Sequence, residues 1–203
     1  MQKPAHTTYP IHDLLKNRWS PRAFSSQPID TEAILSLFEA ARWSPSGNNL
    51  QPWSFIVTTP ADPGPHAKLV STLIGFNALW AQNTPILVMG VVQREREAGK
   101  PNPYAWYDLG QAVAHLSIQA SALGLAVHQM AGFDHPKASE LFELPEGYDP
   151  VIVFALGYPG DPEQLSAELR TRELAPRTRK PLGEFVFNGV WKEPILREET
   201  VNS

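Results

Sequence analysis

Residues 41–57 read ARWSPSGNNLQPWSFIV and hold, in one stretch, the end of a helix, a turn and the start of a strand. Before this stretch, apolar residues recur at helical spacing after Asp30, a predicted N-cap, and the pattern stops before Pro45. A polar, turn-rich segment follows. Residues 53–58, WSFIVT, form a short run rich in β-branched and aromatic residues, which predicts a strand. The stretch therefore predicts a helix, a polar turn and a strand in direct succession.

Helices and short buried strands alternate along the rest of the chain. Apolar residues at helical spacing predict helices, and short apolar runs predict buried strands. A short helical pattern near residue 10 is followed by expected helices at about 31–44, 67–81, 105–123 and 134–141. The expected strands span 53–58, 86–92, 125–130 and 151–156, and the expected loops include 60–65 and 93–104. This alternation favours an α+β fold in which helices pack on a sheet.

The composition changes after Gly157. Residues 159–181 hold four prolines, and five basic residues lie between Arg170 and Lys180. The pattern of the last forty or so residues is too extended for this part to fold alone. We expect residues 1–203 to form a single domain whose C-terminal arm, about 160–203, wraps a partner subunit, so that the protein is a homodimer.

The composition also excludes several kinds of chemistry. The 203 residues contain no cysteine, which removes disulfides, thiolate zinc sites, iron–sulfur clusters and cysteine nucleophiles. No run of 18 apolar residues and no secretory leader is visible, so we expect a cytoplasmic protein that does not insert in membranes. The net charge of −4 argues against nucleic acid as the main partner.

Motifs for self-sufficient catalysis are absent from the sequence. It has no G-x-G-x-x-G, no P-loop and no G-x-S-x-G, and its six histidines never fall at metal-binding spacing. We expect no metal site, and we interpret His115, within the long apolar helix, as a core or interface histidine. An enzyme with so little chemistry of its own would depend on a cofactor.

Two arginines and a serine form the first candidate binding segment, Arg18-x-Ser20-x-Arg22. In extended backbone, residues two apart face the same side, so both guanidinium groups and the hydroxyl converge. Arginine forks suit phosphate, and each charge-assisted hydrogen bond contributes roughly 1.5–3 kcal/mol. The alternative is a pair of exposed arginines that meet surface carboxylates.

A second same-side pair, Arg177 and Arg179, lies far downstream. It could add cations to the same anion site. The alternative interpretation of the whole 170–180 cluster is a solvated charged face balanced by Glu168 and Glu173.

Two further segments offer fixed hydrogen-bonding groups. The amides and hydroxyls of residues 43–53, held between prolines, could read the edge of a planar heterocycle, although the same residue types populate ordinary turns. Residues 129–134 lie where an expected strand meets an expected helix, so backbone N–H groups are free and Gly132 permits close approach.

In order and spacing, these segments resemble the FMN-dependent nitroreductase family. The stretches that carry the resemblance lie between about residues 13 and 190 and read RWSPRAF, ARWSPSGNNLQPWSFIV, LGLAVHQMAGF, LPEGYDPVIVFALGYP and RTRKPL. The resemblance implies a three-layer α+β fold, with a central, mostly antiparallel sheet flanked by helices. It also implies an intertwined homodimer with two FMN sites at the interface.

The resemblance further implies roles for individual residues. The FMN phosphate and the pyrimidine side of the ring would be held by Arg18, Ser20 and Arg22, with the phosphate site completed by Arg177 and Arg179. The residues that would reach the flavin from the other subunit are Pro45, Ser46, Gly47 and Asn49. Those that would pass along the ring, with backbone N–H near N5, are Gln129, Met130, Ala131 and Gly132, and the residue matching a ring-contacting asparagine is Asn77.

Two features depart from the family pattern. Many relatives carry Glu-Gly where this chain has Ala131-Gly132, so a carboxylate near the nicotinamide is missing. Relatives often place lid helices where this chain has only residues 93–104, which leaves the pocket open or covered by Tyr104, Trp106 and the partner's aromatic residues. Both departures bear on the substrate more than on FMN.

The implied activity is that of an FMN-dependent NAD(P)H oxidoreductase. In a ping-pong cycle it would reduce nitroaromatic, quinone or related small-molecule acceptors by two electrons. Three alternatives stay open: another flavoenzyme on this scaffold (dehydrogenase, dehalogenase or flavin destructase), a flavin store or redox sensor without turnover, and a flavin-free dimeric interaction protein. NADH and NADPH are not distinguished, because no dinucleotide-binding motif is readable.

Overall fold

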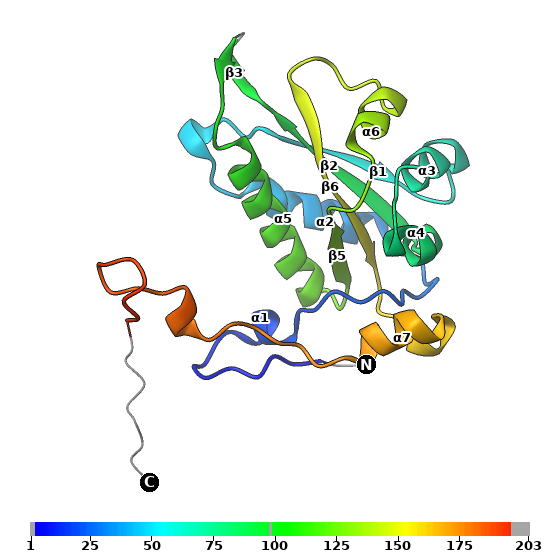
Figure 1. Ribbon diagram of the computed structural model, residues 1–203. Coiled ribbons are helices and arrows are strands. Elements are labelled where there is room, and N and C mark those ends of the chain that lie inside the picture. Colours follow the sequence, from blue (N-terminus) through cyan, green and yellow to red (C-terminus); the bar gives the residue numbers. More distant parts are fainter. Residues whose placement is uncertain (1–2, 98, 196–203) are drawn as a thin grey trace.

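A four-stranded sheet in the order β1-β2-β6-β5 forms the centre of the protein (Figure 1). The computed structural model describes residues 3–97 and 99–195. The strands are β1 (Trp53–Thr58), β2 (Ile86–Gln93), β5 (Ala126–Met130) and β6 (Tyr148–Gly157). All three neighbouring pairs are antiparallel. The predicted antiparallel sheet is confirmed, and all four predicted strands are present within three residues of their expected ends.

Helices cover both faces of this sheet. The α-helices are α1 (Asp13–Asn17), α2 (Thr31–Arg42), α3 (Pro63–Val70), α4 (Phe76–Trp80), α5 (Ala105–Ala122), α6 (His135–Leu141) and α7 (Ala167–Leu174). The short 3₁₀ turns are η1 (Gly47–Asn49), η2 (Ala81–Asn83), η3 (Pro162–Gln164) and η4 (Leu182–Glu184). A small hairpin, β3 (Glu95–Glu97) with β4 (Lys100–Pro101), occupies the charged 93–104 connection. Within the described ranges, no helix is long and apolar enough to cross a membrane.

Alternation along the strands builds two apolar layers. In β2, Ile86 and Val88 pack with α2 and α5, whereas Leu87 and Met89 pack with α3, α4 and α6. Burial of each such side chain stabilises the fold by roughly 1.5–3 kcal/mol. The three-layer α+β arrangement is therefore confirmed.

The expected single helix at 67–81 is wrong. Asp62 and Pro63 start a helix earlier, inside the expected 60–65 loop, and α3 ends at Val70. Gly75 has φ +57°, a left-handed conformation that favours glycine, and precedes the separate helix α4. The break places Asn77 in the first turn of α4.

Two further features were not evident from the sequence. The proline-bearing 159–181 segment contains the helix α7, which Ser166 caps by accepting from Leu169 N–H at 3.4 Å. His115 is exposed on α5, with Nδ1 2.5 Å from Ser44 Oγ, so the core interpretation is wrong, whereas the interface interpretation stays a prediction. The apolar spacing of α5 does not distinguish an inward position from a neighbouring outward one.

The segment after α1 is held against the end of β6. Phe24 pairs with Pro159, Gly160 N–H donates to Ala23 C=O at 2.8 Å, and Ser25 N–H donates to Tyr158 C=O at 2.9 Å. The two segments are in close contact here: a Cβ on Gly160 would lie 2.6 Å from the Phe24 carbonyl carbon. This attachment fixes residues 18–25 in space although they form no regular element.

We predict that Gly160→Ala destabilises the protein by about 1–3 kcal/mol, because backbone atoms of Phe24 cannot yield to the added methyl. Gly64→Ala is the matched control: nothing lies within 4 Å of its Cβ position in α3, so the protein should be unchanged or more stable by up to about 1 kcal/mol. Urea unfolding measures both. Equal effects of the two substitutions would contradict the close packing at Gly160.

Candidate functional site

A cation-lined pocket of about 200 Å³ lies between the N-terminal segment and residues 172–179. Six of its lining residues are basic: Lys3, Arg18, Arg22, Arg172, Arg177 and Arg179. Ser20 and Trp19 also line it. The structure therefore brings together the two arginine pairs that lie about 150 residues apart in the sequence.

Three of these arginines have no carboxylate partner among the described residues. Arg18 Nη1 donates to Ser20 Oγ at 3.4 Å, and Arg177 Nη1 donates to the carbonyl oxygens of Lys3 at 2.6 Å and Lys16 at 3.0 Å. Arg179 Nη1 donates to Thr178 C=O at 2.7 Å. Burial, and then the charges of Arg177 and Arg179, lower the pKa of Arg18. The cluster thus has an excess of positive charge that an anion would relieve.

Among the described residues, Glu173 supplies the one carboxylate in the lining of this pocket, and its side chain is 1% exposed. The carboxylate accepts Arg22 N–H at 3.0 and 2.9 Å and Ala23 N–H at 3.2 Å, and Arg22 Nη1 lies 3.6 Å from Oε2. Lys3 Nζ donates to the carbonyl oxygens of Glu173 and Ala175 at 2.5 and 2.6 Å. The interpretation of Glu173 as part of a solvated face is wrong: it fastens α7 to the Arg22 segment.

A second group of predicted residues meets at the end of β5. Asn77 Nδ2 donates to Gly132 C=O at 3.1 Å, and Ile74 N–H donates to the same oxygen at 3.2 Å. A Cβ on Gly132 would lie 2.7 Å from Asn77 Nδ2, so the close approach depends on glycine. Gln129 and Ala131 are exposed, whereas Met130 is buried in the core.

The turn that carries Pro45, Ser46, Gly47 and Asn49 lies on the surface before β1. Gly47 N–H donates to Asp108 Oδ2 at 3.1 Å, and Gln51 N–H donates to Ser46 Oγ at 3.0 Å. Asn48, Asn49 and Gln51 have φ between 50° and 56°, which costs roughly 1–2 kcal/mol for each non-glycine residue. Backbone strain of this kind is common at functional sites.

This turn is not part of the cation pocket of the same chain. Gly47 contacts Asp108 near the start of α5, whereas Arg18 lines a cavity with Ser121 and Gly124 near its end. The axial rise of α5 from residue 108 to 121 corresponds to about 20 Å. Of the fourteen predicted residues, the structure groups five at the pocket and two at the Asn77–Gly132 contact. It places the surface turn elsewhere.

His128, on β5, is a neighbour of the pocket that the sequence predictions did not include. Its Nδ1 lies 2.7 Å from Pro21 C=O, and because a carbonyl oxygen only accepts, Nδ1 carries the proton. The centroid of its ring lies 4.6 Å from that of Trp80. Burial lowers the pKa of His128 to about 4, so the ring is neutral at pH 7. His128 therefore orients Pro21, between Ser20 and Arg22, without adding charge.

Comparison with known proteins shows the family of this chain. Residues 15–69 and 70–158 match the sequence pattern of the nitroreductase family. The chain belongs to the nitroreductase family. A solved structure described as the oxidoreductase containing FMN is 32% identical, covers 93% of this chain and 96% of its own, and superposes with a TM-score of 0.86.

Proteins similar to this chain have names that give different activities. A Streptococcus pyogenes serotype M6 protein, named as a candidate NAD(P)H nitroreductase, is 22% identical over 81% of this chain and 98% of its own length. Iodotyrosine deiodinase 1 of Rattus norvegicus is 35% identical over 29% of this chain and 24% of its own length. The chain is thus a nitroreductase-like oxidoreductase.

The sequence predicted neither of two buried carboxylates: Glu173 was named only as part of a solvated face, and Asp108 was not singled out. Glu173 lies four residues after the buried Leu169, on the same face of α7, and that spacing is a signal of burial. Asp108 lies in the first turn of α5, a position where exposed acidic residues are common. Its partner Gly47 is 61 residues away, and no sequence pattern links the two.

We predict that His128 makes stability fall in acid. Its pKa is lower in the folded protein than the unperturbed value of 6.5, so its contribution is present above pH 6.5 and is lost as the pH falls toward 4. The loss amounts to about 3 kcal/mol. Unfolding free energies of wild type and His128→Asn, measured from pH 7 to 4, should converge toward low pH. Parallel curves would contradict the neutral buried histidine.

Proposed function

We propose that this nitroreductase-family chain is an FMN-dependent NAD(P)H oxidoreductase. It passes two electrons at a time to nitroaromatic, quinone or related acceptors in a ping-pong cycle. The observation that carries the proposal is the pocket in which Arg18, Arg177 and Arg179 have no carboxylate partner among the described residues, close to the end of β6 and beside α7. The similarity to an FMN-containing oxidoreductase and to a protein named for NAD(P)H supports the choice of cofactor and donor.

The pocket residues fit a dianionic phosphate. Arg18, Arg177 and Arg179 offer guanidinium donors, and Ser20 adds a hydroxyl. Burial, and then their crowded positive charge, lower the pKa of Arg18 and of Arg177, and a phosphate would remove the repulsion between these charges on binding. In our proposal these four residues hold the FMN phosphate.

The end of β5 fits the ring side of the same cofactor. Gln129, Met130, Ala131 and Gly132 provide backbone along the ring, and Asn77 fixes Gly132 by its hydrogen bond. FMN, when bound, supplies the hydride-accepting and hydride-donating chemistry. Nearby cations and N–H donors stabilise the negative charge that reduction adds. Ala131 has no carboxyl group, so in our proposal water at the open site provides protons.

A homodimer completes this site in our proposal. The turn with Pro45, Ser46, Gly47 and Asn49 lies far from the pocket of its own protomer, so it would serve the pocket of the partner. Exposed residues at helical spacing along α5, among them Tyr107, Gly110 and Ala114, form a surface on which a second copy could pack. The groove of about 580 Å³ between the N-terminal segment and the C-terminal arm is lined by apolar residues such as Ile11 and Leu182.

Reductive dehalogenation is the second candidate. The local similarity to iodotyrosine deiodinase 1 favours it. That reaction would use the same FMN site and differ in the acceptor. Tyr104 and Trp106, at the start of α5 near the turn of residues 45–49, would reach the ring bound by the partner and would then select a halogenated aromatic compound.

We predict that the purified protein shows a bound-flavin absorption band that bleaches on anaerobic addition of NADH or NADPH. The donor that bleaches it faster identifies the nicotinamide preference. A flavin band that neither donor bleaches would contradict the reductase proposal and favour dehalogenation, another flavin chemistry or storage. A colourless protein that also fails to bind added FMN would contradict the cofactor itself.

We also predict complementation between subunits. Arg18→Ala and Asn49→Ala homodimers should each lose FMN, one through the phosphate and the other through the partner's turn. Refolding the two variants together should restore about a quarter of all sites, because half of the dimers are mixed and each mixed dimer holds one intact site. Bound flavin per chain measures this. No recovery, with mixed dimers present, would contradict a site shared between subunits.

A further inference from the structure

The charge of Glu173 requires an explanation beyond packing. A neutral acceptor could satisfy the N–H groups of Arg22 and Ala23, yet the residue present is an acid that is 1% exposed. Removing a carboxylate from water costs several kcal/mol, and a buried ion pair often contributes no net stability. The negative charge is therefore better explained by what it does to the neighbouring cations.

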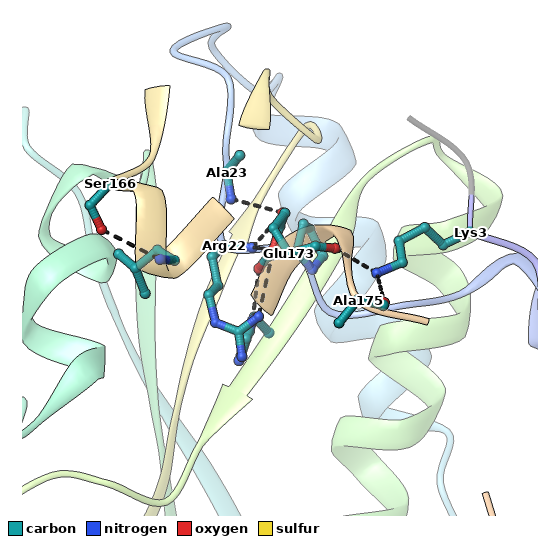
Figure 2. A network of polar contacts seen from close by, with 9 residues as sticks. Lys3, Arg22, Ala23, Ser166, Glu173 and Ala175 are labelled. Atoms are coloured by element: carbon teal, nitrogen blue, oxygen red, sulfur yellow. Dashed lines mark hydrogen bonds and ion pairs between the residues drawn. The ribbon is translucent and has the colours of Figure 1, made fainter. Parts of the chain in front are cut away.

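Glu173 acts on Arg22 twice. Its carboxylate accepts the Arg22 backbone N–H at 2.9 and 3.0 Å, and the Arg22 guanidinium lies 3.6 Å from the same carboxylate (Figure 2). Arg18, Arg177 and Arg179 have no such partner among the residues described. Of the five arginines that line the pocket, these three are uncompensated and Arg172 pairs with the exposed Glu168. Arg22 is both oriented and partly neutralised by the buried Glu173.

Arg22 also borders a second cavity, of about 440 Å³, between α4 and α7. Leu79 and Trp80 of α4 line this cavity, and the same short helix carries Asn77, which contacts Gly132. Arg22 thus lies between the phosphate-binding arginines and the segment proposed to hold the ring.

From this geometry, and on the basis of the proposed function, we infer that Glu173 is a positioning residue for Arg22. It holds the Arg22 side chain away from the FMN phosphate, and its negative charge reduces the positive potential that Arg22 exerts at the ring. The phosphate is bound by Arg18, Arg177 and Arg179. Glu173 weakens the preference of the site for reduced FMN, so that reduced FMN remains able to give its electrons to an acceptor.

The test compares affinities of the apoprotein for oxidised FMN, anaerobically reduced FMN and riboflavin. Glu173→Gln should raise the reduced-over-oxidised affinity ratio about fivefold or more, because it removes a negative charge near the ring. Arg22→Gln should lower the same ratio by a similar factor. Arg18→Gln should instead lower the FMN-over-riboflavin ratio about tenfold, since a charge-assisted hydrogen bond to phosphate is lost.

Glu168→Gln is the matched control. Glu168 lies on the same helix, α7, is exposed, and pairs with Arg172 at 3.4 Å. The same change in charge there should leave both ratios within about twofold of wild type, because exposed charges are strongly screened.

Three results would overturn the inference. In Glu173→Gln, equal weakening of all three ligands together with a lower melting temperature would show a structural clamp only. If the reduced-over-oxidised affinity ratio is unchanged in both Glu173→Gln and Arg22→Gln, the Arg22–Glu173 pair does not affect the preference of the site for reduced or oxidised FMN. If Arg22→Gln lowers the FMN-over-riboflavin affinity ratio as much as Arg18→Gln does, Arg22 belongs with the arginines that bind the phosphate.

Arg22→Gln decides the question if Glu173→Gln does not fold. Failure of the wild-type apoprotein to bind FMN at all would contradict the proposed function and, with it, this inference. Normal FMN binding with unchanged ratios would contradict the inference alone.

Discussion

The arrangement of the site depends on the buried carboxylate of Glu173. Two irregular segments, residues 18–25 and 175–181, carry most of the cations, and like charges would drive them apart. Glu173 accepts N–H groups from Arg22 and Ala23 while Lys3 binds the carbonyl oxygens beside it. These contacts, with the Phe24–Pro159 bridge to the end of β6, hold both segments against the sheet. The arginines can then gather without an anion, and their excess charge is available to a ligand.

A second buried carboxylate has the same role at the opposite end of α5. Asp108, 2% exposed, accepts Gly47 N–H and fixes a turn with several left-handed residues. The cation pocket and the turn of residues 45–49 therefore lie at opposite ends of α5 and do not meet within one chain. In our proposal they meet across a dimer, where the turn of one subunit faces the arginines of the other. Each carboxylate preorganises its surface before a ligand arrives, which lowers the ordering cost of binding.

The sequence predicted the regular parts of the fold well and the connections between them poorly. The strands, α2, α5 and α6 follow from periodicity and from caps such as Asp134, whose side chain accepts Lys137 N–H at 3.0 Å. The α3–α4 break at Gly75 and the helix α7 were missed, since a short helix with prolines nearby has a weak periodic signal. For the site, the arginine pairs were predicted from their spacing. Glu173, Asp108 and His128 were not, because their partners are distant in sequence and burial reverses the usual exposure of acids and histidines.

The arrangement of cations in the structure suggests a division of tasks in the proposed enzyme. Arg18, Arg177 and Arg179 provide binding energy through charge, whereas the Arg22–Glu173 pair adjusts how that charge acts on the ring. The crystal structure of the protein with FMN tests this account most directly. It should show the phosphate among Arg18, Arg177 and Arg179, Arg22 still paired with Glu173, and Asn49 of a second copy beside the ring. A phosphate bound away from these three arginines, or a ring enclosed by one protomer alone, would contradict it.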